Sequence, residues 1–119
     1  GEPLCFGVPG PTAKAPYDTV RKALPDVTAI VAENDSLAVS VMQNARERGV
    51  SLPEQLAVFG CDNTAEGREL VPALSTIEVP AKQMGERAAK LMRELLKDST
   101  WSARITLAGE MIYRASCGC

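Results

Sequence analysis

The sequence contains no histidine among its 119 residues. Histidine is the commonest general base and the commonest metal ligand in proteins, so its absence argues against a catalytic centre and against a metal site. The sequence also lacks a glycine-rich phosphate loop and the Gly-x-Ser-x-Gly turn that carries a nucleophilic serine. We therefore expect no enzymatic activity, no cofactor and no bound metal.

Long apolar runs and clusters of basic residues are missing as well. No stretch approaches the roughly 18 apolar residues of a membrane span, and the first residues lack the basic start and apolar core of a signal peptide. Charges of both signs are mixed, with 13 Lys and Arg against 15 Asp and Glu. The sequence therefore shows no basic face for nucleic acid, and we expect a cytoplasmic chain that makes no membrane contact.

Cysteine is scarce, with four residues at positions 5, 61, 117 and 119. They do not form the paired C-x-x-C sets of a zinc site, and a C-x-C sequence is a poor set of disulfide partners. We therefore expect reduced cysteines. Cys61 has no histidine to stabilise a thiolate, so packing is a better role for it than nucleophilic chemistry.

The sequence does show short apolar stretches that alternate with helical patterns. Its length of 119 residues limits it to one domain. We expect strands at residues 4–8, 29–32, 56–59 and 105–113, an extended segment at 72–80, and helices at 17–24, 36–48, 65–70 and 81–97. This alternation is typical of βαβ units, and it predicts an α/β fold with a doubly wound, mainly parallel sheet and helices on both faces.

Polar pairs follow two of the predicted strands. Asn34 and Asp35 come after the strand at 29–32, and Asp62 and Asn63 come after the next strand. The carboxyl ends of parallel strands share one edge of a sheet, which is where open α/β sheets bind ligands. The Asp62 carboxylate can accept hydrogen bonds from two neighbouring hydroxyls; alternatively, Asp62 caps the helix at 65–70.

The amide of Asn34 can both donate and accept hydrogen bonds, so it can contact a hydroxyl in either sense. Asp35 is better placed to cap the helix at 36–48, and we do not expect it to contact a ligand. The sequence thus predicts a ligand site at this edge that includes Asn34 and Asp62.

An ordered series of motifs carries a family resemblance. The series comprises AENDSLA at 32–38, ERGV at 47–50, LPE at 52–54, GCDN at 60–63, PALSTI at 72–77, MG at 84–85 and MIYRASC at 111–117. It resembles the effector-binding domain of LacI/GalR-type transcriptional regulators. That family shares its ligand-binding fold, the type I periplasmic-binding-protein fold, with periplasmic sugar-binding proteins.

The resemblance implies a function. The 119 residues would form the C-terminal subdomain of an effector domain that binds a sugar or a nucleoside, and DNA would be bound by a headpiece absent from this sequence. Asp62 and Asn34 match positions that contact the ligand in the family. The alternative is an extracellular sugar-binding protein of a transporter.

The resemblance also implies a homodimer, in which Val39 and Leu70 match apolar interface positions. The alternative for both residues is that they fill the core of their own domain. In the family the segment at 81–97 packs on an N-terminal subdomain, which this sequence lacks. We expect its apolar stripe, formed by Met84, Ala88, Leu91 and Leu95, to be buried, either on its own sheet or, as we prefer, against a second molecule.

Overall fold

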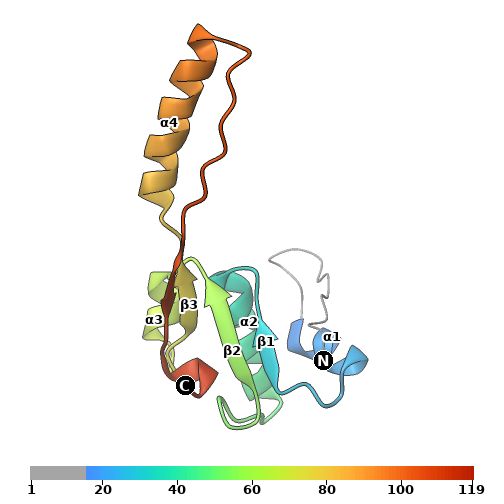
Figure 1. Cartoon of the computed structure of the whole chain (residues 1–119). Coiled ribbons are helices and arrows are strands. Elements are labelled where there is room, and N and C mark those ends of the chain that lie inside the picture. Colours follow the sequence, from blue (N-terminus) through green and yellow to red (C-terminus); the bar gives the residue numbers. More distant parts are fainter. Residues whose placement is uncertain (1–15) are drawn as a thin grey trace.

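Three neighbouring strands of the four-stranded sheet run parallel (Figure 1). The computed structural model describes residues 16–119. β1 (Ala29–Val31) pairs with β2 (Ala57–Cys61), β2 pairs with β3 (Ser75–Glu78), and β4 (Glu110–Ile112) joins β3 in the antiparallel direction. The predicted α/β fold with a mainly parallel sheet is confirmed, and the strand predicted at 4–8 lies outside the described residues.

The helices begin and end close to the predicted positions. They are α1 (Pro16–Ala23), α2 (Asp35–Glu47), α3 (Ala65–Glu69) and α4 (Ala81–Lys97). Gly49 ends α2 in the left-handed conformation with φ of 73°, which glycine adopts without a steric penalty. The N–H of Val50 then donates to the carbonyl of Ala45 at 3.0 Å, which completes a Schellman cap.

The core lies between α2 and the strands. One face of this helix is apolar and buried, at Ala38, Val41, Met42 and Ala45. These residues belong to the same buried cluster as Tyr17, Leu56, Val58 and Leu74. Burial of each large side chain stabilises the fold by about 1.5–3 kcal/mol.

Helices α2 and α3 lie on the same face of the sheet. A Cβ atom at Gly60 in β2 or at Gly67 in α3 would meet the same carboxylate, that of Asp35. On the opposite face, Phe59 and Tyr113 form an edge-to-face ring pair with centroids 6.3 Å apart. Within residues 16–119 no α-helix covers that face.

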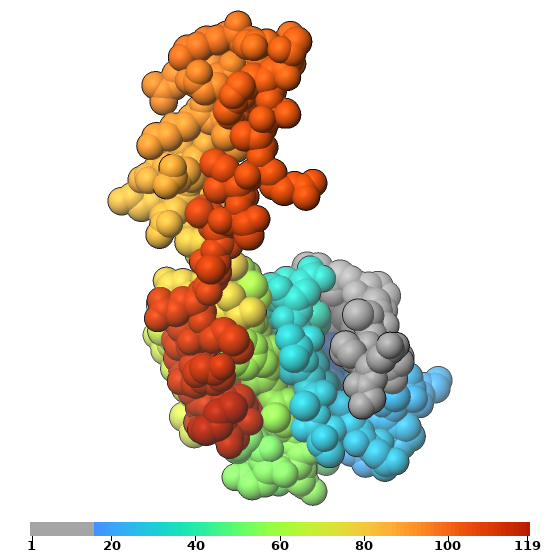
Figure 2. Space-filling view, viewed as in Figure 1, coloured from blue at the N-terminus to red at the C-terminus, as the bar shows by residue number. Residues whose placement is uncertain are grey.

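Helix α4 projects from the sheet as an arm, together with the chain that returns from it to β4 (Figures 1 and 2). The molecule measures 58 Å along its longest axis and less than 30 Å along the other two. No residue of α4 is buried, and Met84 of the predicted stripe is 49% exposed. The possibility that the stripe folds back onto its own sheet is therefore wrong for this structure.

The strand predicted at 105–113 is present only at its C-terminal end. Residues 102–109 run beside α4, where Ile105 and Leu107 face Met84 and Leu91 across a shallow groove. A helix offers no free backbone groups for pairing, so this segment forms no ladder. Strand hydrogen bonding begins at Glu110, where the chain reaches β3.

Candidate functional site

Asn34 and Asp62 follow adjacent parallel strands. β1 and β2 pair through Val31 and Phe59 near their carboxyl ends, and Asn34 and Asp62 come shortly after these ends. Both residues therefore lie at the same edge of the sheet, as the sequence predicts. Asn34 is half-buried and Asp62 is exposed, so solvent reaches both side chains.

Asn34 caps helix α2. Its side-chain oxygen accepts a hydrogen bond from the N–H of Leu37 at 2.8 Å, and its backbone is extended. The prediction that Asp35 is the cap is therefore wrong, because Asn34 is the residue that precedes the first helical turn. The amide nitrogen of Asn34 is still able to donate a hydrogen bond to a ligand.

Asp35 is a fully buried carboxylate. It accepts hydrogen bonds from the N–H of Thr64 at 2.7 Å, from the Thr64 hydroxyl at 3.2 Å and from the Thr76 hydroxyl at 2.6 Å. A buried charge is costly unless it is hydrogen-bonded, and three donors meet this need. Asp35 thus fixes the N-terminal end of α2 against the loop that carries Asp62.

Asp62 has a backbone conformation that is rare for a residue with a side chain. Its φ is 109°, and that of Asn63 is 52°. The N–H of Asp62 donates to the carbonyl of Ile77 at 2.8 Å, which holds the turn to β3. Thr64, whose hydroxyl accepts from the N–H of Gly67 at 3.2 Å, is the cap of α3. Capping α3 is therefore not the role of Asp62, and strained residues of this kind cluster at functional sites.

Asn63 is held by the protein itself. Its side-chain oxygen accepts a hydrogen bond from the guanidinium of Arg114 at 2.6 Å. Its N–H donates to the Thr76 hydroxyl at 3.3 Å, and its carbonyl accepts from Arg68 at 2.9 Å. Sequence reasoning missed Arg114, because it lies 51 residues away from Asn63 and no local pattern connects the two positions.

Cys61 precedes Asp62 and is a free, half-buried thiol. Burial raises the pKa of the Cys61 thiol, and the negative charges of Asp62 and Asp35 raise it further. The thiol is therefore protonated at neutral pH, which makes it a poor nucleophile. This agrees with packing as its expected role.

A hollow of about 510 Å³ lies at the base of the arm, where β3 leads into α4. Its lining combines charged, amide and small apolar side chains: Glu78, Val79, Pro80, Ala81, Lys82, Gln83, Ala108 and Glu110. It opens beyond the carboxyl end of β3, the strand that pairs with β2. The arm thus begins beside the same edge of the sheet that carries Asp62.

The two predicted dimer residues are placed differently. Val39 is only 3% exposed and belongs to the core of its own domain, so it has almost no surface to offer a partner. Leu70 is half-buried and packs against the same core, with part of its side chain accessible. The core alternative therefore describes Val39 in this structure.

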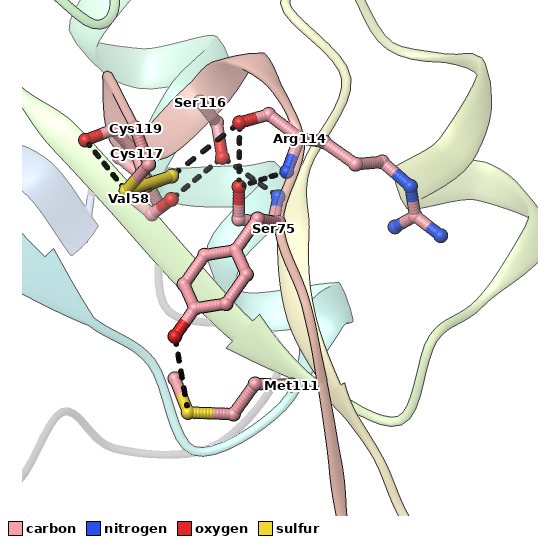
Figure 3. Close-up of a disulfide and its surroundings, with 8 residues drawn as sticks. Val58, Ser75, Met111, Arg114, Ser116, Cys117 and Cys119 are labelled. Atoms are coloured by element: carbon pink, nitrogen blue, oxygen red, sulfur yellow. Dashed lines mark hydrogen bonds between the residues drawn. A yellow bond between two sulfur atoms is a disulfide. The ribbon is translucent and has the colours of Figure 1, made fainter.

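The C-terminal turn η1 (Ala115–Cys117) is hydrogen-bonded to β2 and β3 (Figure 3). The hydroxyl of Ser116 donates to the carbonyl of Val58 at 2.6 Å and accepts from the N–H of Ser75 at 2.8 Å. Cys117 and Cys119 form a disulfide with a Cα–Cα distance of 5.4 Å. The expectation that they are reduced is wrong here, because the left-handed Gly118 folds the two cysteines together.

Within residues 16–119, no group of three or more Cys, Asp or Glu residues is arranged to hold a metal ion. None of the described helices is both long and apolar enough to span a bilayer.

Comparison with known proteins identifies the family. A family model described as a periplasmic binding protein-like domain matches residues 7–117. The lactose operon repressor of Rhizobium radiobacter is 39% identical over 88 residues, which cover 74% of this chain and 78% of that protein. The regulator AscG of Escherichia coli K12 is 36% identical over 75% of this chain, but the match spans only 26% of AscG.

Solved structures agree with this match. A LacI family transcriptional regulator from Arthrobacter sp. FB24, in complex with lactose, is 28% identical with a TM-score of 0.73, over 92% of this chain and 42% of that chain. The regulator CelR, in complex with cellobiose, is 25% identical with a TM-score of 0.77, over 86% of this chain and 32% of that chain. The chain therefore belongs to the family of periplasmic binding protein-like domains, as part of the effector domain of a LacI/GalR-type transcriptional regulator.

Proposed function

We propose that this chain binds a small polyhydroxylated molecule, a sugar or a nucleoside, at the carboxyl edge of β1 and β2. The observation that carries the proposal is the exposed carboxylate of Asp62, held at a φ of 109° in a turn fixed by internal hydrogen bonds. A fixed carboxylate can accept hydrogen bonds from two adjacent hydroxyls of a sugar ring.

The intact protein is, in this proposal, a cytoplasmic repressor and not an enzyme. Binding of the ligand would shift the orientation of a separate DNA-binding headpiece by closing two subdomains around the ligand. The relatives support a regulator rather than the receptor of a transporter, since they are named as the repressors of a lactose operon and of a ribose operon. Two similar regulators were solved with lactose and with cellobiose bound.

The same proposal gives roles to the arm and to Leu70, the residue that follows α3. The stripe on α4 would pack against the second subdomain or against another copy of the chain, because large exposed apolar surfaces favour association. A homodimer would use Leu70, which keeps accessible surface, but not Val39.

Asn34 allows a test of the proposal, because its role as the cap of α2 can be separated from its proposed role as a ligand contact. Aspartate caps helices as well as asparagine does, so Asn34→Asp keeps the bond to Leu37 but removes the amide donor. Asn34→Ala removes both and costs about 1 kcal/mol of stability through the lost cap. Gln43→Glu, at an exposed position of the same helix, is the control for the added charge.

The experiment is titration calorimetry of the intact protein with lactose, cellobiose and ribose. We expect at least one of these sugars to bind, and Asn34→Asp to weaken it on the order of tenfold, since a buried group that loses its partner costs about 1–3 kcal/mol. Gln43→Glu should bind as the unaltered protein does. Equal affinity in all three proteins would show that Asn34 does not contact the ligand.

A further inference from the structure

Arg114 connects the end of β4 to the turn that carries Asp62. One guanidinium nitrogen donates to the side-chain oxygen of Asn63 and the other donates to the carbonyl of Leu74, both at 2.6 Å. Arginine donates from a planar fork, so two bonds in different directions fix the orientation of the whole group. The guanidinium is therefore a rigid link between Leu74, which precedes β3, and Asn63.

The backbone of Arg114 is fixed as firmly as its side chain. The hydroxyl of Ser75 accepts from the N–H of Arg114 at 2.8 Å and donates to its carbonyl at 2.9 Å. Figure 3 shows these two bonds, with the guanidinium extending away from Ser75. Because the backbone of Arg114 and its bond to Leu74 are already fixed, the side chain loses little additional conformational freedom when it bonds Asn63.

Asn63 needs such support because of its conformation. Its φ of 52° lies in the left-handed region, which asparagine adopts more readily than most residues but which still costs energy. Asp62 precedes it with a φ of 109°, a value that residues with side chains rarely adopt. Two strained residues in sequence persist only where surrounding contacts over-determine them.

We propose that Arg114 is the positioning residue of the ligand site: it holds Asn63, and Asn63 in turn keeps the Asp62 carboxylate facing solvent at the edge of the sheet. This rests on the proposed function for the role of Asp62 as a ligand contact. The link between Arg114 and the turn is independent of any ligand.

The first test needs no ligand. Amide hydrogen exchange would be measured residue by residue in Arg114→Lys, because lysine ends in a single ammonium group in place of the two guanidinium nitrogens that make these bonds. We expect exchange at Asp62 and Asn63 to become on the order of tenfold faster, while exchange in α2 barely changes. Arg104→Lys, at an exposed position whose side chain makes no hydrogen bond within residues 16–119, is the matched control.

A second variant separates positioning from general stability. Asn63→Asp keeps the oxygen that accepts from Arg114 and tolerates the left-handed conformation, so exchange at the turn should stay slow. Uniformly faster exchange across the sheet in Arg114→Lys would mean that Arg114 only stabilises the fold. Unchanged exchange at Asp62 and Asn63 would overturn the positioning role directly.

A binding experiment uses whichever of lactose, cellobiose and ribose binds the intact protein. Arg114→Lys should weaken binding severalfold, and Arg104→Lys should leave it unchanged. If exchange at the turn responds but none of the sugars binds, the proposed function loses support and the positioning role stands. If a sugar binds equally well to Arg114→Lys, the positioning role is refuted while the proposed function survives.

Discussion

The carboxylate of Asp35 accepts a hydrogen bond from the hydroxyl of Thr76 at 2.6 Å, across 41 residues of sequence. The same hydroxyl accepts from the N–H of Asn63 at 3.3 Å. Asp35, Thr76 and Asn63 thus form a chain of hydrogen bonds that runs from the first turn of α2 through β3 to the loop beside Asp62. The edge of the sheet that carries Asp62 is therefore held in place by hydrogen bonds that begin at a buried residue.

Replacement of Asp35 should destabilise the fold strongly. Asp35→Ala leaves the N–H and hydroxyl of Thr64 and the hydroxyl of Thr76 without their acceptor. Each buried group left unpaired costs about 1–3 kcal/mol. Urea unfolding measures the loss, with Asp26→Ala at an exposed position as the control. A loss below about 1 kcal/mol would mean that water replaces the carboxylate without cost.

Two glycines in different settings should respond in opposite directions to the same substitution. At Gly60 a Cβ would lie 2.3 Å from a carboxylate oxygen of Asp35, so Gly60→Ala should cost about 1–3 kcal/mol through overpacking. At Gly85 in α4 a Cβ meets nothing within 4 Å, and alanine should stabilise that helix by about 1 kcal/mol. Thermal unfolding of both variants checks the pair. Equal shifts would contradict the close approach of Asp35 to β2.

The ion pair between Asp18 and Arg48 predicts a pH dependence. Hydrogen bonds from Arg48 hold the pKa of the Asp18 carboxyl below its ordinary value. A lowered folded-state pKa stabilises the fold above the unfolded-state pKa, and this contribution is lost as the pH falls through the folded-state value. The stability difference between the unaltered chain and Asp18→Asn should therefore shrink below about pH 4. A difference that stays constant down to about pH 2 would show that the pair contributes nothing.

The exposed arm predicts self-association of the 119-residue chain. Leu91 and Leu95 lie on the α4 stripe, and burying each would contribute about 1.5–3 kcal/mol. Sedimentation should show dimers that Leu91→Glu abolishes. Leu96→Glu serves as the control for added charge, since Leu96 lies beside the stripe and is 82% exposed. A strict monomer at high concentration would rule out burial of the stripe between copies.

The sequence predicted the elements with strong local signals and missed those that depend on distant partners. Helix α4 begins and ends as predicted because its amphipathic pattern repeats over 17 residues. The strand predicted at 105–113 is too long. Alternation of apolar and polar residues does not indicate whether a neighbouring strand is present for pairing, and β4 pairs only at 110–112. Asp35 and Arg114 act through residues 29 to 51 positions away, which a local pattern cannot indicate.

The most direct test of the central proposal is the affinity of the intact protein for its sugar when Asp62 is changed to asparagine. The substitution keeps the shape of the side chain and its tolerance of positive φ, but it removes the charge that accepts two hydroxyl bonds. Calorimetry with lactose, cellobiose and ribose should show affinity weakened by about 1–3 kcal/mol, with unfolding unchanged and Asp26→Asn, at an exposed position, as the charge control. Undiminished affinity in Asp62→Asn would contradict a ligand site at this edge of the sheet.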